Sequence, residues 1–203
     1  MVRFFRQRWC QVGLILAGIV LCVVAVERQQ LGGVRILLCV SLITLFIHQF
    51  EEYRLPGYFP RMINTTLFDS REPERFPLNA NTALIINVLL GWSLYVLAIA
   101  FADKALWLAT ATIVVSAGNV VAHLVLFNVK GKTRYNPGMA SAALLFVPMT
   151  IGYFAYLQQH QLLRPDSLVV GICVGALINY FGIFKLIGIL SDKESPYPFE
   201  PFR

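Results

Sequence analysis

Histidine and glutamate side chains lie close together in two apolar stretches of the sequence. His48, Glu51 and Glu52 end the apolar run SLITLFIHQFEEY, and Asn119 and His123 fall within GNVVAHLVLF. Residues three and four positions apart share one face of a helix, so both glutamates lie beside His48, and Asn119 lies beside His123. Ionisable side chains inside apolar helices are costly to bury and tend to be retained for function. The pattern therefore predicts a polar functional site among apolar helices.

Two histidines and a carboxylate are a sufficient ligand set for a zinc ion that keeps one position open for water. Both histidines are expected about five residues before the same end of their helices, roughly 7 to 8 Å from that end at 1.5 Å per residue. We predict His48, Glu52 and His123 as metal ligands, for zinc first and for iron or manganese as alternatives. Glu51 is predicted as the general base that activates water. An exchange of roles between Glu51 and Glu52 is the open alternative.

Further polar residues are predicted near the same end of the helices. Asn119 is expected to orient His123 or a substrate carbonyl, as a catalytic group, or else to form an interhelical hydrogen bond. The stretch YNPG, with Tyr135, Asn136 and Gly138, favours the N-terminal cap of a helix. The alternative is that its free N–H groups bind an anionic substrate. Asn87 is expected to contribute to substrate binding as well.

The composition indicates the solvent in which these helices lie. The chain has 203 residues, of which 57% are hydrophobic and only 14% charged, and its mean hydropathy is +0.65. Soluble globular domains carry about 25% charged residues. The four cysteines lie in apolar runs without a C-x-x-C spacing, so neither a disulfide framework nor a thiolate metal site is indicated. The sequence predicts an integral membrane protein.

Six stretches are long enough for a membrane span, which needs roughly 17 to 25 helical residues. They lie near residues 9–26, 36–53, 83–102, 105–127, 139–157 and 167–190. The first stretch is read as a retained span because no small-x-small cleavage site precedes Glu27; a signal peptide is the alternative. The sequence therefore predicts an all-α, polytopic bundle forming one domain over residues 1–203. Its longest connection is residues 54–82.

Positive charge is unevenly distributed between the connecting segments. Lysine and arginine concentrate in residues 1–8, 54–82, 130–134 and the C-terminal tail, whereas the alternate segments hold only Arg28, Arg35, Lys104 and Arg164. The positive-inside rule then predicts that both termini and residues 54–82 are cytoplasmic. We expect a bacterial inner (plasma) membrane. The net charge of +6 follows from this topology, so nucleic acid is not expected as a partner.

The motifs resemble those of a known family of membrane proteins. His48-Gln49-Phe50-Glu51-Glu52 resembles the motif of the HXXEE family, Asn119 to His123 is similar to its N-x-x-x-H motif, and Tyr135 to Gly138 resembles its Pro-Gly motif. The likeness extends over nearly the whole chain. It implies a multi-pass membrane fold with a metal-dependent or catalytic site, and it implies no particular reaction. Membrane desaturases are excluded as a class, because they need many more histidines than the three present.

Three functions fit these features. The first is a metal-dependent membrane hydrolase that acts on a lipid or lipid-linked substrate at the cytoplasmic leaflet. The second is a proton-coupled transporter, since intramembrane histidine and glutamate can relay protons; the scarcity of polar residues in the opposite half of the spans speaks against it. The third is a scaffold whose His/Glu cluster only clasps helices. The bilayer is the expected partner in each case, and no oligomeric state is predicted.

Overall fold

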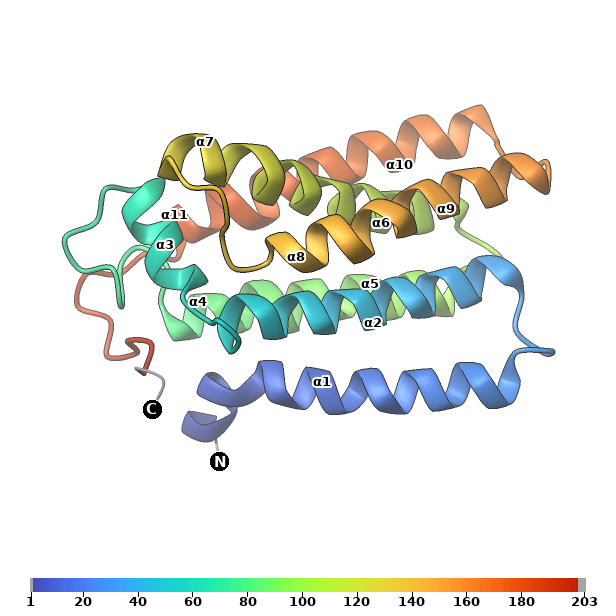
Figure 1. The fold of residues 1–203 in the computed structure, drawn as a ribbon. Coiled ribbons are helices and arrows are strands. Elements are labelled where there is room, and N and C mark those ends of the chain that lie inside the picture. The colour runs from blue at the N-terminus through green and yellow to red at the C-terminus, as the bar shows by residue number, and fades with distance from the viewer. Residues whose placement is uncertain (1, 201–203) are drawn as a thin grey trace.

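The computed structural model describes residues 2–200, which form a bundle of long helices joined by short loops (Figure 1). The first two spans are α1 (Val2–Glu27) and α2 (Gly33–Tyr53). The third span comprises α4 (Ala80–Leu84), η1 (Ile85–Trp92) and α5 (Ser93–Ala100), and the fourth comprises α6 (Leu106–Val121), η2 (Ala122–Leu126) and α7 (Phe127–Gly131). The fifth comprises α8 (Met139–Ser141), η3 (Ala142–Phe146) and α9 (Val147–Gln159), and the sixth comprises α10 (Pro165–Leu177), η4 (Ile178–Lys185) and α11 (Leu186–Ile189).

These six helices are long and apolar enough to cross a membrane. The predicted all-α, multi-span fold is therefore confirmed. The boundaries shift by a few residues, most clearly in the fourth span, which continues to Gly131 where the sequence suggested residue 127. It ends there because Lys132 adopts a left-handed conformation, with φ +49°. Residues 1 and 201–203, which the predicted domain includes, lie outside the described residues.

One short helix lies inside the segment that the sequence suggested was a loop. It is α3 (Phe59–Thr66), and Pro60 suits its first turn because a helix leaves its first N–H groups unbonded. Phe59 and Ile63 stand four residues apart on one face and are 7% and 1% exposed. That face packs against the bundle, so α3 covers the helix ends from which the predicted site residues come.

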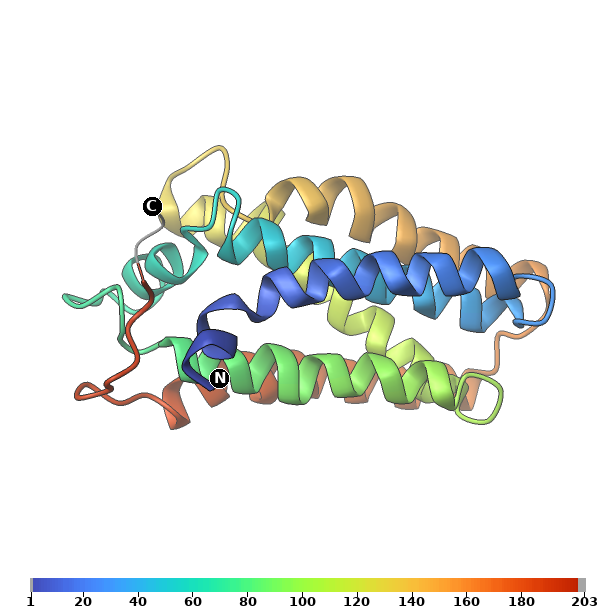
Figure 2. The same ribbon diagram turned by 90° about the horizontal axis from the view of Figure 1, so that it is seen from below.

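The second and fourth spans lie deepest in the bundle. Within the most apolar window of each span, 56% of residues in the second and 50% in the fourth are buried, against 22% in the first and third and 11% in the sixth. Figure 2 shows the fourth span crossing the bundle obliquely. The spans that carry the two histidine motifs are thus shielded by the others, whereas the third and sixth face outward.

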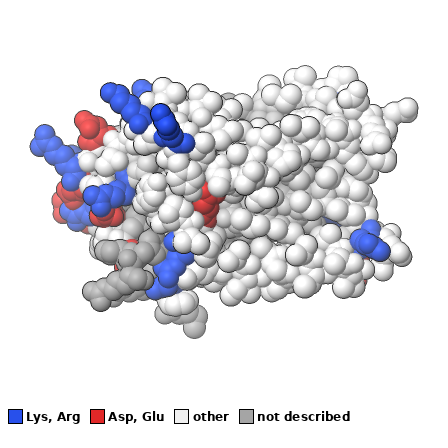
Figure 3. All heavy atoms as spheres, viewed as in Figure 1, with Lys and Arg blue, Asp and Glu red and all other residues white. Residues whose placement is uncertain are grey.

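The two ends of the bundle differ in charge. Both ends of the described chain lie at one end, together with α3 and residues 132–138 (Figure 1). Lysine, arginine, aspartate and glutamate side chains gather at this end in Figure 3, and few appear elsewhere on that face. We call it the charged end.

Candidate metal centre

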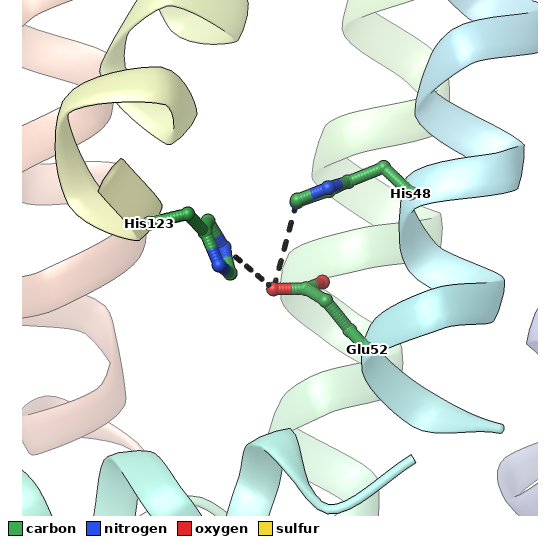
Figure 4. A group of neighbouring side chains, drawn as sticks. All are labelled: His48, Glu52 and His123. Atoms are coloured by element: carbon green, nitrogen blue, oxygen red, sulfur yellow. Dashed lines mark ion pairs between the residues drawn. The ribbon is translucent and has the colours of Figure 1, made fainter. Parts of the chain in front are cut away.

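Two histidines and one glutamate from two spans meet near the charged end (Figure 4). Glu52 and His48 come from α2, and His123 comes from η2. Glu52 Oε1 lies 3.2 Å from His123 Nε2 and 3.6 Å from His48 Nε2, and the three candidate ligand atoms all lie within 4.8 Å of one another. Each of the three residues is at most 5% exposed. The structure thus brings the predicted ligand set together.

Unusual helical geometry accompanies this cluster. The third, fourth, fifth and sixth spans each contain a π-helical segment, whereas α2 stays α-helical and keeps His48 and Glu52 on one face. π-helix accounts for well under 1% of residues in ordinary proteins and is found mostly at functional sites. His123 lies within one of these segments. The local winding of the fourth span therefore takes part in placing its imidazole.

Asn136 fixes the orientation of His123. Its Nδ2 donates to the His123 carbonyl at 2.8 Å and to Asn128 Oδ1 at 2.8 Å, so its Oδ1 is the acceptor that faces His123 Nδ1 at 2.7 Å. Nδ1 must then carry the proton, an assignment that follows from the hydrogen-bond network. The Nε2 of His123 consequently turns a lone pair towards Glu52.

Ser141 fixes the orientation of His48 in a similar way. Its Oγ lies 2.5 Å from Glu51 Oε2 and 2.8 Å from His48 Nδ1. The single hydroxyl proton goes to the carboxylate, so His48 Nδ1–H donates to Oγ and Nε2 is left unprotonated. Among the described residues no hydrogen-bond partner reaches this buried Nε2. Leaving such an atom unsatisfied costs about 1 to 3 kcal/mol.

The donor set fits a divalent metal ion. Two imidazole lone pairs and a carboxylate oxygen converge in a buried space, and three acceptors cannot satisfy one another. Ligands bound to zinc at about 2.0 to 2.1 Å in tetrahedral directions lie about 3.3 Å apart. The separations of 3.2 Å and 3.6 Å are close to this value. A metal would satisfy His48 Nε2, which lacks a donor within the described chain.

Glu51 lies in a different environment from the one expected of a general base. Its Oε1 accepts hydrogen bonds from Tyr135 Oη at 2.9 Å and Ala140 N at 3.0 Å, and its Oε2 accepts from Ser141 N at 2.8 Å and Oγ at 2.5 Å. Four donors thus hold the carboxylate against the N-terminus of the fifth span, where a helix favours negative charge. Glu52, and not Glu51, is the glutamate that lies against both histidines.

Tyr135, predicted to bind substrate, is a partner of Glu51 instead. Burial raises the pKa of Tyr135 to about 12, and the hydrogen bond to Glu51 acts in the same direction. The phenol therefore remains a donor at neutral pH. The N–H groups that were expected to attract an anionic substrate at this helix start are already bonded to Glu51.

Asn136, and not Asn119, contacts His123 in the structure. Asn119 does not orient His123: its Nδ2 donates to Val115 O in its own helix at 3.3 Å. Asn136 performs that function, although the sequence suggested a cap or a substrate contact. Asn87 links spans rather than reaching the cluster, because it accepts from Gln49 at 3.1 Å and donates to Tyr53 Oη at 3.2 Å.

Gly138 makes room for both imidazoles. Its φ is +95°, in the left-handed region that side chains disfavour. A Cβ at this position would lie 2.8 Å from both His123 Nδ1 and His48 Cε1. Glycine is required here by conformation and by close approach to the two rings.

An apolar cavity of about 480 Å³ reaches the cluster. His48, Glu52 and His123 form part of its wall, and Asn87 and Asn119 line it as well. More than half of the remaining wall residues belong to the third and sixth spans, and leucine and isoleucine are the commonest types among them. We call it the apolar cavity. Ser141 and Gln49, which hold the cluster and the third span in place, were not singled out from the sequence.

Comparison with known proteins identifies a family. No curated protein and no solved structure matches the chain. The sequence model described as "Protein of unknown function with HXXEE motif" matches residues 39–153, more than half of the 203 residues. The matched region contains both histidines of the cluster, Glu51, Glu52 and Ser141. The chain therefore belongs to the HXXEE family.

Proposed function

We propose that the protein is a metal-dependent integral membrane enzyme that hydrolyses a lipid or lipid-linked substrate. One observation carries this proposal: His48 Nε2, His123 Nε2 and Glu52 Oε1 converge in a buried space, and His48 Nε2 has no donor among the described residues. These three residues would hold the ion, with zinc favoured by the His₂Glu set and iron or manganese as alternatives. The metal would supply a Lewis acid that polarises a carbonyl or phosphoryl oxygen and activates water.

The remaining residues hold the ligands and exclude solvent. Asn136 keeps His123, and Ser141 keeps His48, in the tautomer that offers Nε2. Phe146 lies 4.8 Å from the His48 ring and Phe127 lies 4.9 Å from the His123 ring, as distances between centroids. These rings limit the access of bulk water and lower the local polarity. Polar interactions with the reacting groups are stronger in such surroundings.

The proton acceptor in this proposal is Glu52. Within the described chain it is the one carboxylate in the wall of the apolar cavity, whereas Glu51 is held by four donors. The Oε1 atom of Glu52 faces the histidines and would bind the ion. Its second oxygen would accept the proton that a water molecule loses as it adds to the substrate, and that proton would then pass to the leaving group. Asn119 lines the same cavity and is proposed to bind the substrate carbonyl through its amide. Glu51 acts through Ser141 as a positioning residue.

A lipid substrate is supported by the depth of the cluster. His48 lies five residues before the end of α2 at Tyr53, roughly 7 to 8 Å along the helix. That depth corresponds to the boundary between headgroups and hydrocarbon. With the charged end on the cytoplasmic side of a bacterial inner membrane, the reaction would take place in the cytoplasmic leaflet.

A proton-coupled carrier is the second candidate. The halves of the spans away from the charged end were expected to be nearly apolar, yet buried hydroxyl groups pair there. Tyr95 Oη lies 2.6 Å from Ser116 Oγ, and Thr110 Oγ1 lies 3.0 Å from Tyr153 Oη. Intramembrane Asp, Glu and His residues form proton relays, and these hydroxyl groups would extend such a relay from the cluster into the opposite halves of the spans. Proton uptake into proteoliposomes that is lost in Tyr95→Phe, with no hydrolysis of any lipid, would favour this candidate.

Metal content tests the proposal directly. We would measure bound metal by mass spectrometry for the wild type, His48→Ala and His123→Ala, with His160→Ala as the matched control. His160 is the third histidine of the chain and is exposed. We expect near one equivalent in the wild type and in His160→Ala, and loss in the other two variants. Protein that binds no metal after reconstitution with zinc, iron or manganese would overturn the proposal. It would favour a scaffold in which the His/Glu cluster only holds helices together.

Catalysis is tested separately from binding. Hydrolysis of lipids would be followed in proteoliposomes of metal-loaded protein, for the wild type and Asn119→Ala. We expect Asn119→Ala to keep the metal and to lose turnover, because its amide lines the cavity without contacting His123. Unchanged turnover in this variant would remove Asn119 from the proposed mechanism.

A further inference from the structure

We propose that the apolar cavity binds one hydrocarbon chain of an amphiphile, which enters from the bilayer between the third and sixth spans. The polar end of that molecule lies against His48, Glu52 and His123. That this polar end is the reacting group rests on the proposed function. The binding of the chain itself depends only on the shape and chemistry of the cavity.

The wall of the cavity combines a polar region with a larger apolar one, as an amphiphile requires. The three residues of the cluster and Asn87 supply polar groups in this wall. Other polar groups in the wall already have partners: Tyr95 Oη bonds Ser116, and Asn179 Nδ2 donates to Val114 O at 3.1 Å. A long apolar wall is poorly suited to water, which needs two to four polar partners. A hydrocarbon chain needs none.

The cavity connects the surface of the bundle with its interior. His123 and Tyr95 are each 1% exposed, whereas Leu90 and Leu97 of the third span are 44% and 48% exposed, and all four line the cavity. Among the spans that line the cavity, the third and sixth have the smallest buried fractions. The mouth therefore faces the surroundings of the spans, which in a membrane are lipid chains, and not the charged end.

The length of the cavity suits an extended chain. From Asn87 to Leu97 the wall follows ten residues of the third span, roughly 15 Å at 1.5 Å per residue. An extended hydrocarbon chain can lie along a wall of this length.

Gly182 offers a way to fill the cavity without disturbing the backbone. It lines the cavity on the sixth span, and a Cβ built there would contact only Ile178 Cγ2, at the ordinary distance of 3.5 Å. Gly182→Leu would therefore project a side chain into the space that the hydrocarbon chain occupies. Gly188, on the same span but outside the cavity wall, has no heavy atom within 4 Å of such a Cβ. Gly188→Leu is the matched control.

The test is photocrosslinking in nanodiscs with a saturated long-chain alcohol that carries a diazirine near its methyl end. Mass spectrometry of the peptides would locate the attachment sites. We expect crosslinks concentrated on residues 89–97 and 178–187, reduced severalfold by Gly182→Leu and unchanged by Gly188→Leu. Thermal unfolding of both variants would establish that they remain folded.

Two outcomes would overturn the inference. The first is labelling spread evenly over all outward-facing helices, or labelling that Gly182→Leu leaves unchanged. The second is crosslinking of these segments to a co-purified polypeptide, which would assign the cavity to a protein partner. If the protein binds no metal but the diazirine still labels residues 89–97 and 178–187, the proposed function is overturned and this inference stands. If the protein binds metal but the labelling is not selective for these residues, this inference is overturned and the proposed function stands.

Discussion

Ser141 Oγ lies 2.5 Å from Glu51 Oε2, and this contact joins the second span to the first turn of the fifth. The same hydroxyl lies 2.8 Å from His48 Nδ1. A carboxylate that was expected to perform chemistry thus reaches the candidate metal centre through a serine. Its charge stabilises the protonated Nδ1 of His48 and the start of a helix at the same time. The cluster is therefore supported from the fifth span as well as from the second and fourth.

Replacement of Asn136 by alanine is expected to weaken metal binding. Partners that orient a ligand histidine typically contribute about 10- to 100-fold in metal affinity, and Asn136 contacts His123 Nδ1 at 2.7 Å. Competition with a chelator would measure the affinity. Asn119→Ala is the control, since its amide bonds only Val115 O. Equal losses in both variants would contradict the assignment of the orienting role to Asn136.

Replacement of Glu51 by glutamine is expected to destabilise the fold whether or not metal is present. The substituted amide keeps only one acceptor oxygen, so its NH2 group would face either Tyr135 and Ala140 or Ser141, which all donate to this carboxylate. We expect a loss of about 1 to 3 kcal/mol in the free energy of unfolding. Thermal unfolding in detergent, with and without a chelator, would measure it.

Ser141→Ala separates the two functions of this contact. It keeps the backbone N–H bond to Glu51 at 2.8 Å but removes the acceptor of His48 Nδ1. We expect a drop in metal affinity of about 10-fold with a smaller loss of stability. Chelator competition and thermal unfolding would be compared for the same sample. A normal affinity in this variant would show that His48 needs no support from the serine.

Local signals account for what could be predicted from the sequence. The six spans follow from apolar runs, and the choice of His48, Glu52 and His123 follows from helical spacing. The expected equal depth is inexact, because His48 lies five residues before the end of its span and His123 lies eight residues before Gly131. The roles of Glu51, Asn136 and Ser141 depend on how the start of the fifth span packs against the second and fourth. Ser141 is 93 positions from His48. Spacing within one helix carries no information about such pairs, so these contacts had to be observed.

The helix α3 was missed for a related reason. Its eight residues contain Pro60 and lie in a segment rich in charges and prolines, which resembles a loop. Its stability comes from Phe59 and Ile63, which are buried against the bundle. Phe59 lies 5.5 Å from the ring of His123. Short helices of this kind depend on tertiary packing more than on intrinsic propensity.

The stability conferred by Tyr135 is expected to depend on pH. Its pKa is raised to about 12 in the folded protein, chiefly by burial, so the protonated phenol is favoured in that state. The ordinary tyrosine pKa is about 10. The contribution is therefore fully present below about pH 10 and is lost as the pH rises to about 12. Tyr135→Phe, which lacks the hydrogen bond to Glu51, should be less stable than the wild type by about 1 kcal/mol at neutral pH.

The difference in stability between Tyr135→Phe and the wild type should narrow between about pH 10 and pH 12. Thermal unfolding in detergent across this range would measure it. Tyr197→Phe is the control, because Tyr197 is a tyrosine of comparable exposure at the charged end, 36% against 43%. A constant difference over the whole range would mean that the Tyr135 phenol is not a protonated donor to Glu51.

Substitution of Gly138, the N-cap residue of the fifth span, by alanine is expected to disrupt the candidate metal centre. The residue has φ +95°, and its Cβ would lie 2.8 Å from atoms of both histidine rings. Left-handed backbone costs a non-glycine residue roughly 1 to 2 kcal/mol, and displacement of the rings separates the ligand atoms. We expect lower thermal stability and loss of bound metal. Gly152→Ala, in the same span and with no atom within 4 Å of its Cβ, should change neither quantity. Retention of metal by Gly138→Ala would show that the two imidazoles can shift without losing their ligand geometry.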